Sequence, residues 1–337
     1  MKISDIGQFA LIDAVAKLIA ENHDQNTDSW KNLLDGIGDD CAVWRSEGVN
    51  QLAKVDCQVE GIHFTRKILS WEDLGWKALA VNLSDIAAMG GIPRYALVSL
   101  GLPLDVDVEN VLDLYRGMLK LAAATGTAIA GGNMSRSPVV FVDVNVLGIT
   151  GNAEGKYLSR AAAVPGDLVA VTGWLGSAAA ALEMLGGEKE YNAGISAFLR
   201  EAFARPQPRL AEGRILVATG IKAGIDISDG LLSDLGHICQ ASGVGATVYI
   251  EKLPIRKEVT DSFGQRAEVM ALSGGEDYQL LFTGKEETIE NVRRKTDYPV
   301  TVIGGITAQN RGRVIVLDDA GEQVPTGKTG WDHFKPG

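Results

Sequence analysis

Patterns typical of helices and of strands alternate along this whole chain of 337 residues. Residues 108–125 place apolar side chains at helical spacing, and residues 139–150 alternate apolar and polar side chains as a strand does. Shorter strands are expected at 51–57 and 95–102, with a helix from about 71 to 89 between them. A further strand is expected at 127–130, followed by a glycine-rich turn. This alternation predicts an α/β or α+β fold.

The pattern restarts past Gly151, which predicts two domains, residues 1–150 and 151–337. With 46% apolar residues, the chain can fill two hydrophobic cores. The elements expected in the second domain are a strand at 166–173, helices at 176–185, 210–219 and 286–296, a strand-turn-helix at 223–242, and strands at 300–303 and 313–317.

Composition and charge exclude several classes of protein. The net charge of −11 argues against a general nucleic-acid binder, since phosphate backbones attract basic surfaces. Residues 7–22 are typical of an amphipathic helix rather than a signal peptide, and the longest uncharged stretch, 168–182, is too short to span a bilayer. The three cysteines form no metal-binding or disulfide pattern. We therefore expect a soluble, cytoplasmic protein with no nucleic-acid or membrane partner.

The common nucleotide-binding and hydrolase signatures are missing from the sequence. No GxGxxG opens a helix, and the triplet at 327–329 lacks the glycine of a phosphate loop because Glu322 stands at that position. The four histidines form no HxxxH pair, and no GxSxG occurs. A zinc hydrolase or a serine hydrolase is therefore not indicated.

Aspartates recur in apolar surroundings. Asp56 interrupts an apolar run, and Asp85 lies in the nearly uncharged segment AVNLSDIAAMGG. Asp40, Asp226 and Asp229 lie next to similar apolar segments. A carboxylate in a dry setting is costly unless it is paired or bound to a metal. Each one alone is better explained as a helix cap or turn residue, but five of them with few embedded Lys or Arg favour magnesium.

Seven segments carry a resemblance to a known family, and they occur in that family's order. They are GIGDDCAVW (36–44), VDCQVEGIHF (55–64), WKALAVNLSDIAAMGGIPRYALVSLGLP (76–103), AGGNMSRSP (130–138), GIDISDGLLSDLGHI (224–238), SGGEDYQLLF (273–282) and GWDHF (330–334). Together they resemble the thiamine-monophosphate kinases of the aminoimidazole ribonucleotide synthetase superfamily.

The resemblance implies a PurM-like two-domain fold. Its N-terminal α+β domain would pair strands across a homodimer axis to form an intersubunit β-barrel, and its C-terminal domain would be α/β. It also implies direct, Mg²⁺-assisted transfer of the γ-phosphoryl group of ATP to thiamine monophosphate. No catalytic base is required, because the acceptor phosphate, with a second pKa of about 6, is already ionised near neutral pH.

The resemblance also assigns site residues by position. The implied metal ligands are Asp40, Asp56, Asp85, Asp226 and Asp229. The implied ATP contacts are Gly132, Asn133, Arg160 and Ser228. The implied substrate contacts are His63, Glu276 and Trp331.

Two positions depart from the family's pattern. Asn133 replaces an aspartate, and Lys54 and Val55 replace Ser or Thr residues that help to hold metal. Asn133 could still bind metal weakly through its carbonyl oxygen. The alternative is that the protein binds fewer magnesium ions and has reduced activity, a different acceptor, or a non-catalytic nucleotide-binding role.

Overall fold

The computed structural model describes residues 32–35, 38–46, 48–187, 189–327 and 330–331. The amphipathic helix expected at 7–22 and the end of the last motif lie outside these ranges. Among the described helices, none combines the length and the hydropathy needed to cross a membrane.

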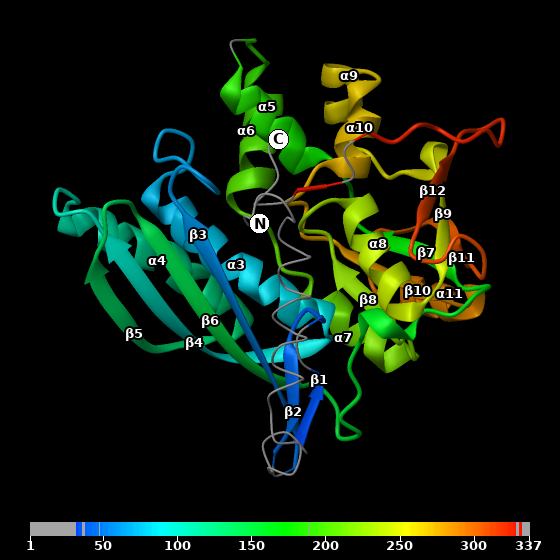
Figure 1. Cartoon of the computed structure of the whole chain (residues 1–337). Helices are drawn as coiled ribbons and strands as arrows, with labels where there is room; N and C mark the ends of the chain where they lie inside the picture. Colours follow the sequence, from blue (N-terminus) through cyan, green and yellow to red (C-terminus); the bar gives the residue numbers. More distant parts are fainter. Residues whose placement is uncertain (1–31, 36–37, 47, 188, 328–329, 332–337) are drawn as a thin grey trace, which may run out of the picture.

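The first half of the chain builds a sheet in the order β1-β2-β3-β6-β4-β5 (Figure 1). Its strands are β1 (Leu33–Asp35), β2 (Ala42–Arg45), β3 (Asn50–Val59), β4 (Gly91–Leu102), β5 (Ala128–Arg136) and β6 (Phe141–Thr150). Neighbouring strands are antiparallel except β4 and β5, which are parallel. Two helices, α3 (Trp71–Ala88) and α4 (Val108–Thr125), cover one face of this sheet.

Helix α3 lies between the first sheet and the second half of the chain (Figure 1). It is buried almost all round from Leu74 to its end, as expected of a helix enclosed on every side. Ser70 caps its start by accepting a hydrogen bond from the backbone N–H of Asp73 at 3.1 Å. This central position lets residues of α3 contact segments from both halves of the chain.

The second half builds a sheet in the order β12-β9-β11-β7-β10-β8, antiparallel except for the parallel pair β12 and β9. Its strands are β7 (Leu168–Thr172), β8 (Ala223–Asp226), β9 (Gly245–Tyr249), β10 (Leu280–Gly284), β11 (Val300–Thr307) and β12 (Val314–Leu317). Its helices are α5 (Ser177–Gly186), α6 (Ala193–Ala204), α7 (Leu210–Thr219), α8 (Leu231–Ser242), α9 (Lys257–Phe263), α10 (Arg266–Ser273) and α11 (Glu286–Lys295). Short 3-10 turns occupy Arg160–Ala162 and Ile250–Lys252.

One local prediction from the sequence is wrong. The glycine-rich segment after residue 130 was expected to turn, but β5 runs through it to Arg136, paired with β4. Gly132 lies directly opposite Val98, and a Cβ atom at Gly132 would lie 1.9 Å from the carbonyl oxygen of Val98. Glycine is therefore needed here for the close approach of two strands.

Candidate functional site

Three buried carboxylates meet between the two halves of the chain. Asp40 lies just before β2, Asp85 lies on α3, and Asp226 is the last residue of β8. One oxygen of each lies within 4.8 Å of the others. None of the three residues is more than 6% exposed. The fold therefore brings three of the five predicted metal ligands into one cluster, which we call the carboxylate cluster.

Each member of the carboxylate cluster is held by a polar neighbour. The hydroxyl of Ser84 donates to Oδ2 of Asp226 at 2.6 Å, and the guanidinium of Arg160 donates to Oδ1 of Asp40. Among the described residues, Oδ2 of Asp40 has no hydrogen-bond partner although it is buried. That oxygen therefore remains available to a cation.

Asp39 positions the predicted ATP-binding residue Arg160. Its Oδ2 atom accepts from the hydroxyl of Ser159 at 2.8 Å and from the backbone N–H of Arg160 at 3.2 Å. The sequence indicates no role for Asp39, whose contact with Ser159 joins residues 120 positions apart. In the sequence, only the neighbouring Asp40 marks this segment as part of a candidate site.

Lys54 lies beside the carboxylate cluster, with its Nζ atom 3.2 Å from Oδ1 of Asp85. Burial alone would lower the pKa of Lys54, but the charges of Asp85 and Asp56 more than offset this and hold that pKa above its ordinary value. Lys54 and Asp56 are two residues apart on β3, so both point to the face covered by α3. The lysine that departs from the family's pattern is thus a direct partner of a predicted metal ligand.

Two members of the carboxylate cluster, Asp85 and Asp226, have pKa values above the ordinary range. Burial raises the pKa of Asp226 to about 7, with the charge of Asp40 adding to the effect. Burial also raises the pKa of Asp85 well above its ordinary value, and Lys54 opposes this shift. Carboxylates in such a setting are stabilised in their charged form by a bound cation.

A second group of predicted residues gathers on the loops beside Asp226. The backbone N–H of Glu276 donates to the carbonyl of Ser228 at 2.8 Å, and that of Trp331 donates to the carbonyl of Asp229 at 3.2 Å. The predicted ATP contact Ser228, the predicted ligand Asp229 and two predicted substrate contacts therefore share one region.

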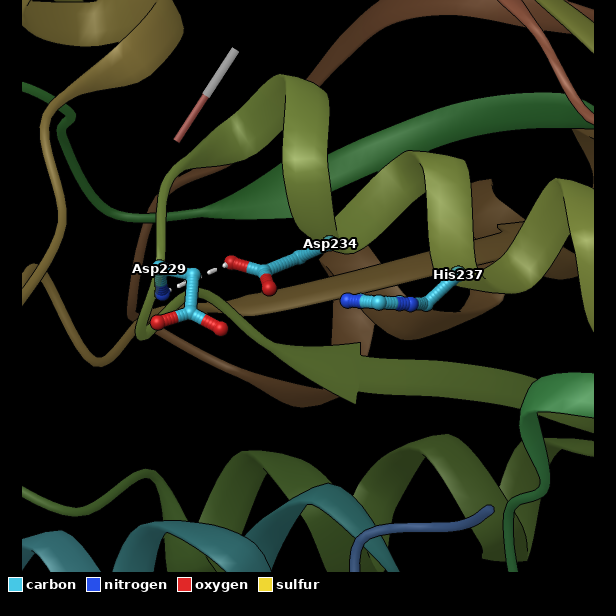
Figure 2. Close-up of side chains that lie close together, drawn as sticks. All are labelled: Asp229, Asp234 and His237. Atoms are coloured by element: carbon cyan, nitrogen blue, oxygen red, sulfur yellow. Dashed lines mark hydrogen bonds between the residues drawn. The ribbon is translucent and has the colours of Figure 1, made fainter. Parts of the chain in front are cut away.

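Asp234 shapes the loop that carries Ser228 and Asp229, a role that the sequence did not reveal. Its Oδ2 atom accepts from the backbone N–H groups of Ser228, Asp229 and Gly230 at 3.1, 3.2 and 3.1 Å. Figure 2 shows this contact to Asp229 and the ring of His237 directed towards the Asp234 carboxylate. Through these three hydrogen bonds to one oxygen, Asp234 holds the loop in place.

The remaining predicted residues lie elsewhere in the chain. His63 follows β3, and its Nδ1 atom accepts from the backbone N–H of Val59 at 3.0 Å. Gly132 and Asn133 lie on the edge strand β5, three strand spacings, about 14 Å, from β3. Asn133 stands in register with Ser99, on the sheet face opposite to Lys54. The two departures from the family pattern are therefore not neighbours within one chain.

Comparison with known proteins places this site in a family. Residues 38–150 match the AIR synthase related protein, N-terminal domain, and residues 164–317 match the C-terminal domain. The thiamine-monophosphate kinase of Bacillus subtilis is 37% identical over 309 residues, covering 89% of this chain and 93% of that protein. That of Aquifex aeolicus is 34% identical over 337 residues, covering 99% of this chain and 100% of that protein.

Two of the solved structures that this chain resembles belong to the same family as its relatives in sequence. The structure described as AaThiL complexed with AMPPCP and TMP has a TM-score of 0.84 and 33% identity, covering 99% of both chains. Thiamine-monophosphate kinase from Stenotrophomonas maltophilia has a TM-score of 0.74 and 34% identity, covering 94% of this chain and 98% of that chain. The chain therefore belongs to the thiamine-monophosphate kinase family of the AIR synthase related proteins, kinases with a two-domain PurM-like fold.

Proposed function

We propose that this chain transfers the γ-phosphoryl group of ATP to thiamine monophosphate, giving ADP and thiamine diphosphate. Relatives named thiamine-monophosphate kinase match nearly the whole length of this chain, and a solved relative holds AMPPCP together with TMP. The observation that carries the proposal is the carboxylate cluster, in which Asp40, Asp85 and Asp226 lie within reach of one cation.

The carboxylate cluster fits magnesium, because it offers only oxygen ligands and includes a buried oxygen of Asp40 without a hydrogen-bond partner among the described residues. Asp40, Asp85 and Asp226 would hold the metal with Asp56, while Asp229 would act from the neighbouring loop. Magnesium, when bound, screens the repulsion between two phosphate-bearing substrates and stabilises the charge of the transition state.

The chain's own residues position the two substrates. Arg160, fixed by Asp39 and Asp40, supplies a guanidinium for the nucleotide phosphates, and Ser228 supplies a polar contact beside Asp226. Glu276, Trp331 and His63 would contact thiamine monophosphate. Because the acceptor phosphate is already ionised near neutral pH, catalysis consists of positioning and charge stabilisation.

With Lys54 present, the site would bind fewer magnesium ions than the same site would bind without this lysine. Its ammonium group, 3.2 Å from Asp85, supplies positive charge where a second divalent ion would otherwise bind. The ammonium group and a divalent ion cannot both occupy this position. We infer that the enzyme works with a reduced metal complement.

A homodimer would complete the site. The sheet face opposite α3 exposes Val55, Tyr95 and Leu97, at 53%, 54% and 42%, which a pairing of two N-terminal domains (1–150) would cover. The sheet separates Asn133 from the carboxylate cluster of its own chain. Gly132 and Asn133 would therefore contact the nucleotide bound by the partner subunit, while residues 151–337 form the second domain of each chain.

The direct test is incubation of the purified protein with ATP, Mg²⁺ and thiamine monophosphate, followed by measurement of ADP and thiamine diphosphate. Equal formation of both products is expected. ADP without thiamine diphosphate would indicate another acceptor. Binding of ATP without either product would indicate a non-catalytic nucleotide-binding protein.

A further inference from the structure

Lys77 is a fully buried lysine that forms an ion pair with Glu276. The residue is 0% exposed, and its Nζ atom lies 2.9 Å from Oε1 of Glu276. The same Nζ atom lies 3.4 Å from the centre of the Phe203 ring, at cation–π distance. Lysine is almost never fully buried unless it is paired, so the ion pair with Glu276 explains how a lysine can be buried at this position.

The geometry of α3 links this ion pair to the carboxylate cluster. Lys77 and Ser84 are seven residues apart, close to two helical turns, so they lie on the same stripe of the helix. Ser84 donates to Asp226, and Lys77 contacts Glu276. One buried helix thus fixes a carboxylate of the predicted metal site and a carboxylate of the predicted acceptor site.

The backbone around Glu276 is strained and held in place. Glu276 has a φ of 68° and Tyr278 a φ of 47°, left-handed values that are strained for a non-glycine residue. The N–H of Glu276 donates to Ser228, and that of Tyr278 donates to Ile227, each at 2.8 Å. The next side chain, Asp277, turns away and accepts from the backbone N–H of Gly176 at 2.6 Å.

We propose that Lys77 is a positioning residue for recognition of the acceptor: it fixes Oε1 of Glu276 so that the other oxygen faces the cationic part of thiamine monophosphate. This inference rests on the proposed function. The Glu276 side chain is 22% exposed, so a ligand can reach it, whereas Lys77 cannot be reached. The thiazolium ring of thiamine carries a permanent positive charge, which an oriented carboxylate attracts.

The predicted consequence is selective for the acceptor. Replacing Lys77 by Met leaves an unbranched side chain that is one heavy atom shorter and removes the charge, so Glu276 loses its fixed orientation. We expect the KM for thiamine monophosphate to rise at least about tenfold and the KM for ATP to stay within about twofold. A residue with only a structural role would instead change both values together or lower the amount of folded protein.

The experiment compares steady-state kinetics of wild type, Lys77→Met, Glu276→Gln and the double variant, with thermal melting of each. Lys120→Met is the matched control, since Lys120 forms a surface ion pair with Glu72 at 2.6 Å. Both single variants should raise the KM for thiamine monophosphate alone, and the double variant should be no worse than either, because the two residues act as one unit. Glu276→Gln tests the same prediction if Lys77→Met does not fold.

The outcomes separate this inference from the proposed function. If the wild type turns over, an unchanged ratio of the two KM values in Lys77→Met would overturn the role of Lys77 alone. The same result in Glu276→Gln would also overturn the assignment of Glu276 to the acceptor. Independent, additive effects of the two substitutions would overturn it as well. Wild-type protein that does not phosphorylate thiamine monophosphate would overturn the proposed function, and this inference with it.

Discussion

Asp40, Asp85 and Asp226 bring together more negative charge than the described ion-pair partners, Lys54 and Arg160, supply as positive charge. This excess of negative charge supports the proposed binding of a cation, and the ion pair of Lys54 with Asp85 supports the proposal that Lys54 limits the number of ions bound. If Lys54 stands in the place of a bound ion, as proposed above, one residue changes how many magnesium ions the chain binds.

Removing Lys54 should add a metal site. In the presence of AMPPCP, we expect Lys54→Ser to bind one more Mg²⁺ per chain than wild type, because Asp85 loses its ammonium partner. Calorimetric titration and elemental analysis measure the number of ions directly. Lys120→Ser, on the surface, should bind as many as wild type. Equal stoichiometry in Lys54→Ser and wild type would contradict this account.

Asp277 should make stability depend on pH. Burial raises its pKa from the ordinary value of 3.8 to about 7, although backbone N–H groups at the start of α5 oppose the shift. A group that binds its proton more tightly when folded stabilises the fold most below pH 4. That contribution is lost as the pH rises towards 7, by about 1.4 kcal/mol per pH unit.

Asp277→Asn isolates this effect because asparagine does not titrate. Urea unfolding at pH 5 and 7 should show wild type losing about 2–3 kcal/mol of unfolding free energy relative to the variant. A difference that does not change with pH would show that Asp277 keeps an ordinary pKa in the folded protein.

At the scale of elements, the close contact between α3 and α4 depends on two glycines. A Cβ atom at Gly75 would lie 1.8 Å from the carbonyl oxygen of Leu114, and one at Gly117 would lie 1.9 Å from that of Glu72. These neighbours are backbone atoms, so neither can move aside as a flexible side chain would. The position of α3, and hence of Lys77, Ser84 and Asp85, follows from this packing.

Gly75→Ala should therefore lower the unfolding free energy by at least about 2 kcal/mol, since overpacking in a rigid contact forces the helices apart. Gly236→Ala in α8 is the matched control, because nothing lies within 4 Å of a Cβ atom there. That control should be neutral or stabilise by up to about 1 kcal/mol. Equal stability changes in the two variants would contradict this account of helix packing.

The long periodic elements could be predicted from the sequence, because the spacing of apolar residues that indicates each one lies within its own segment. The helix expected at 108–125 is α4 with the same bounds, and the helix expected from 71 to 89 is α3. The helices α6, α9 and α10 were not predicted. The predicted strand that corresponds to β5 was too short, because glycines that usually mark a turn here allow the close approach of β4.

The site residues could be predicted only where the neighbouring sequence made them unusual. Asp40, Asp85 and Asp226 could be chosen because a carboxylate in an apolar segment is unusual, and the fold does bring them together. The roles of Asp39, Lys77 and Asp234 depend on partners distant in sequence or on loop geometry, so neither spacing nor composition could predict them.

At the scale of the whole molecule, the exposed face of the first sheet predicts a dimer. Leu97→Asp places a charge at the centre of that face and should convert a two-chain particle to a single chain in sedimentation experiments. Val269→Asp on α10, 61% exposed and away from the sheet, should leave the mass unchanged. A wild-type monomer, or a Leu97→Asp dimer, would contradict the proposed assembly.

In the proposed reaction, the phosphoryl group passes directly between two substrates held at one cluster of carboxylates. The most direct measurement follows the label from [γ-³²P]ATP in the presence of Mg²⁺ and thiamine monophosphate. We expect one labelled thiamine diphosphate for each ADP formed, and a loss of labelled product of at least about a hundredfold in Asp85→Asn. Label released as inorganic phosphate, or undiminished transfer in Asp85→Asn, would contradict the account.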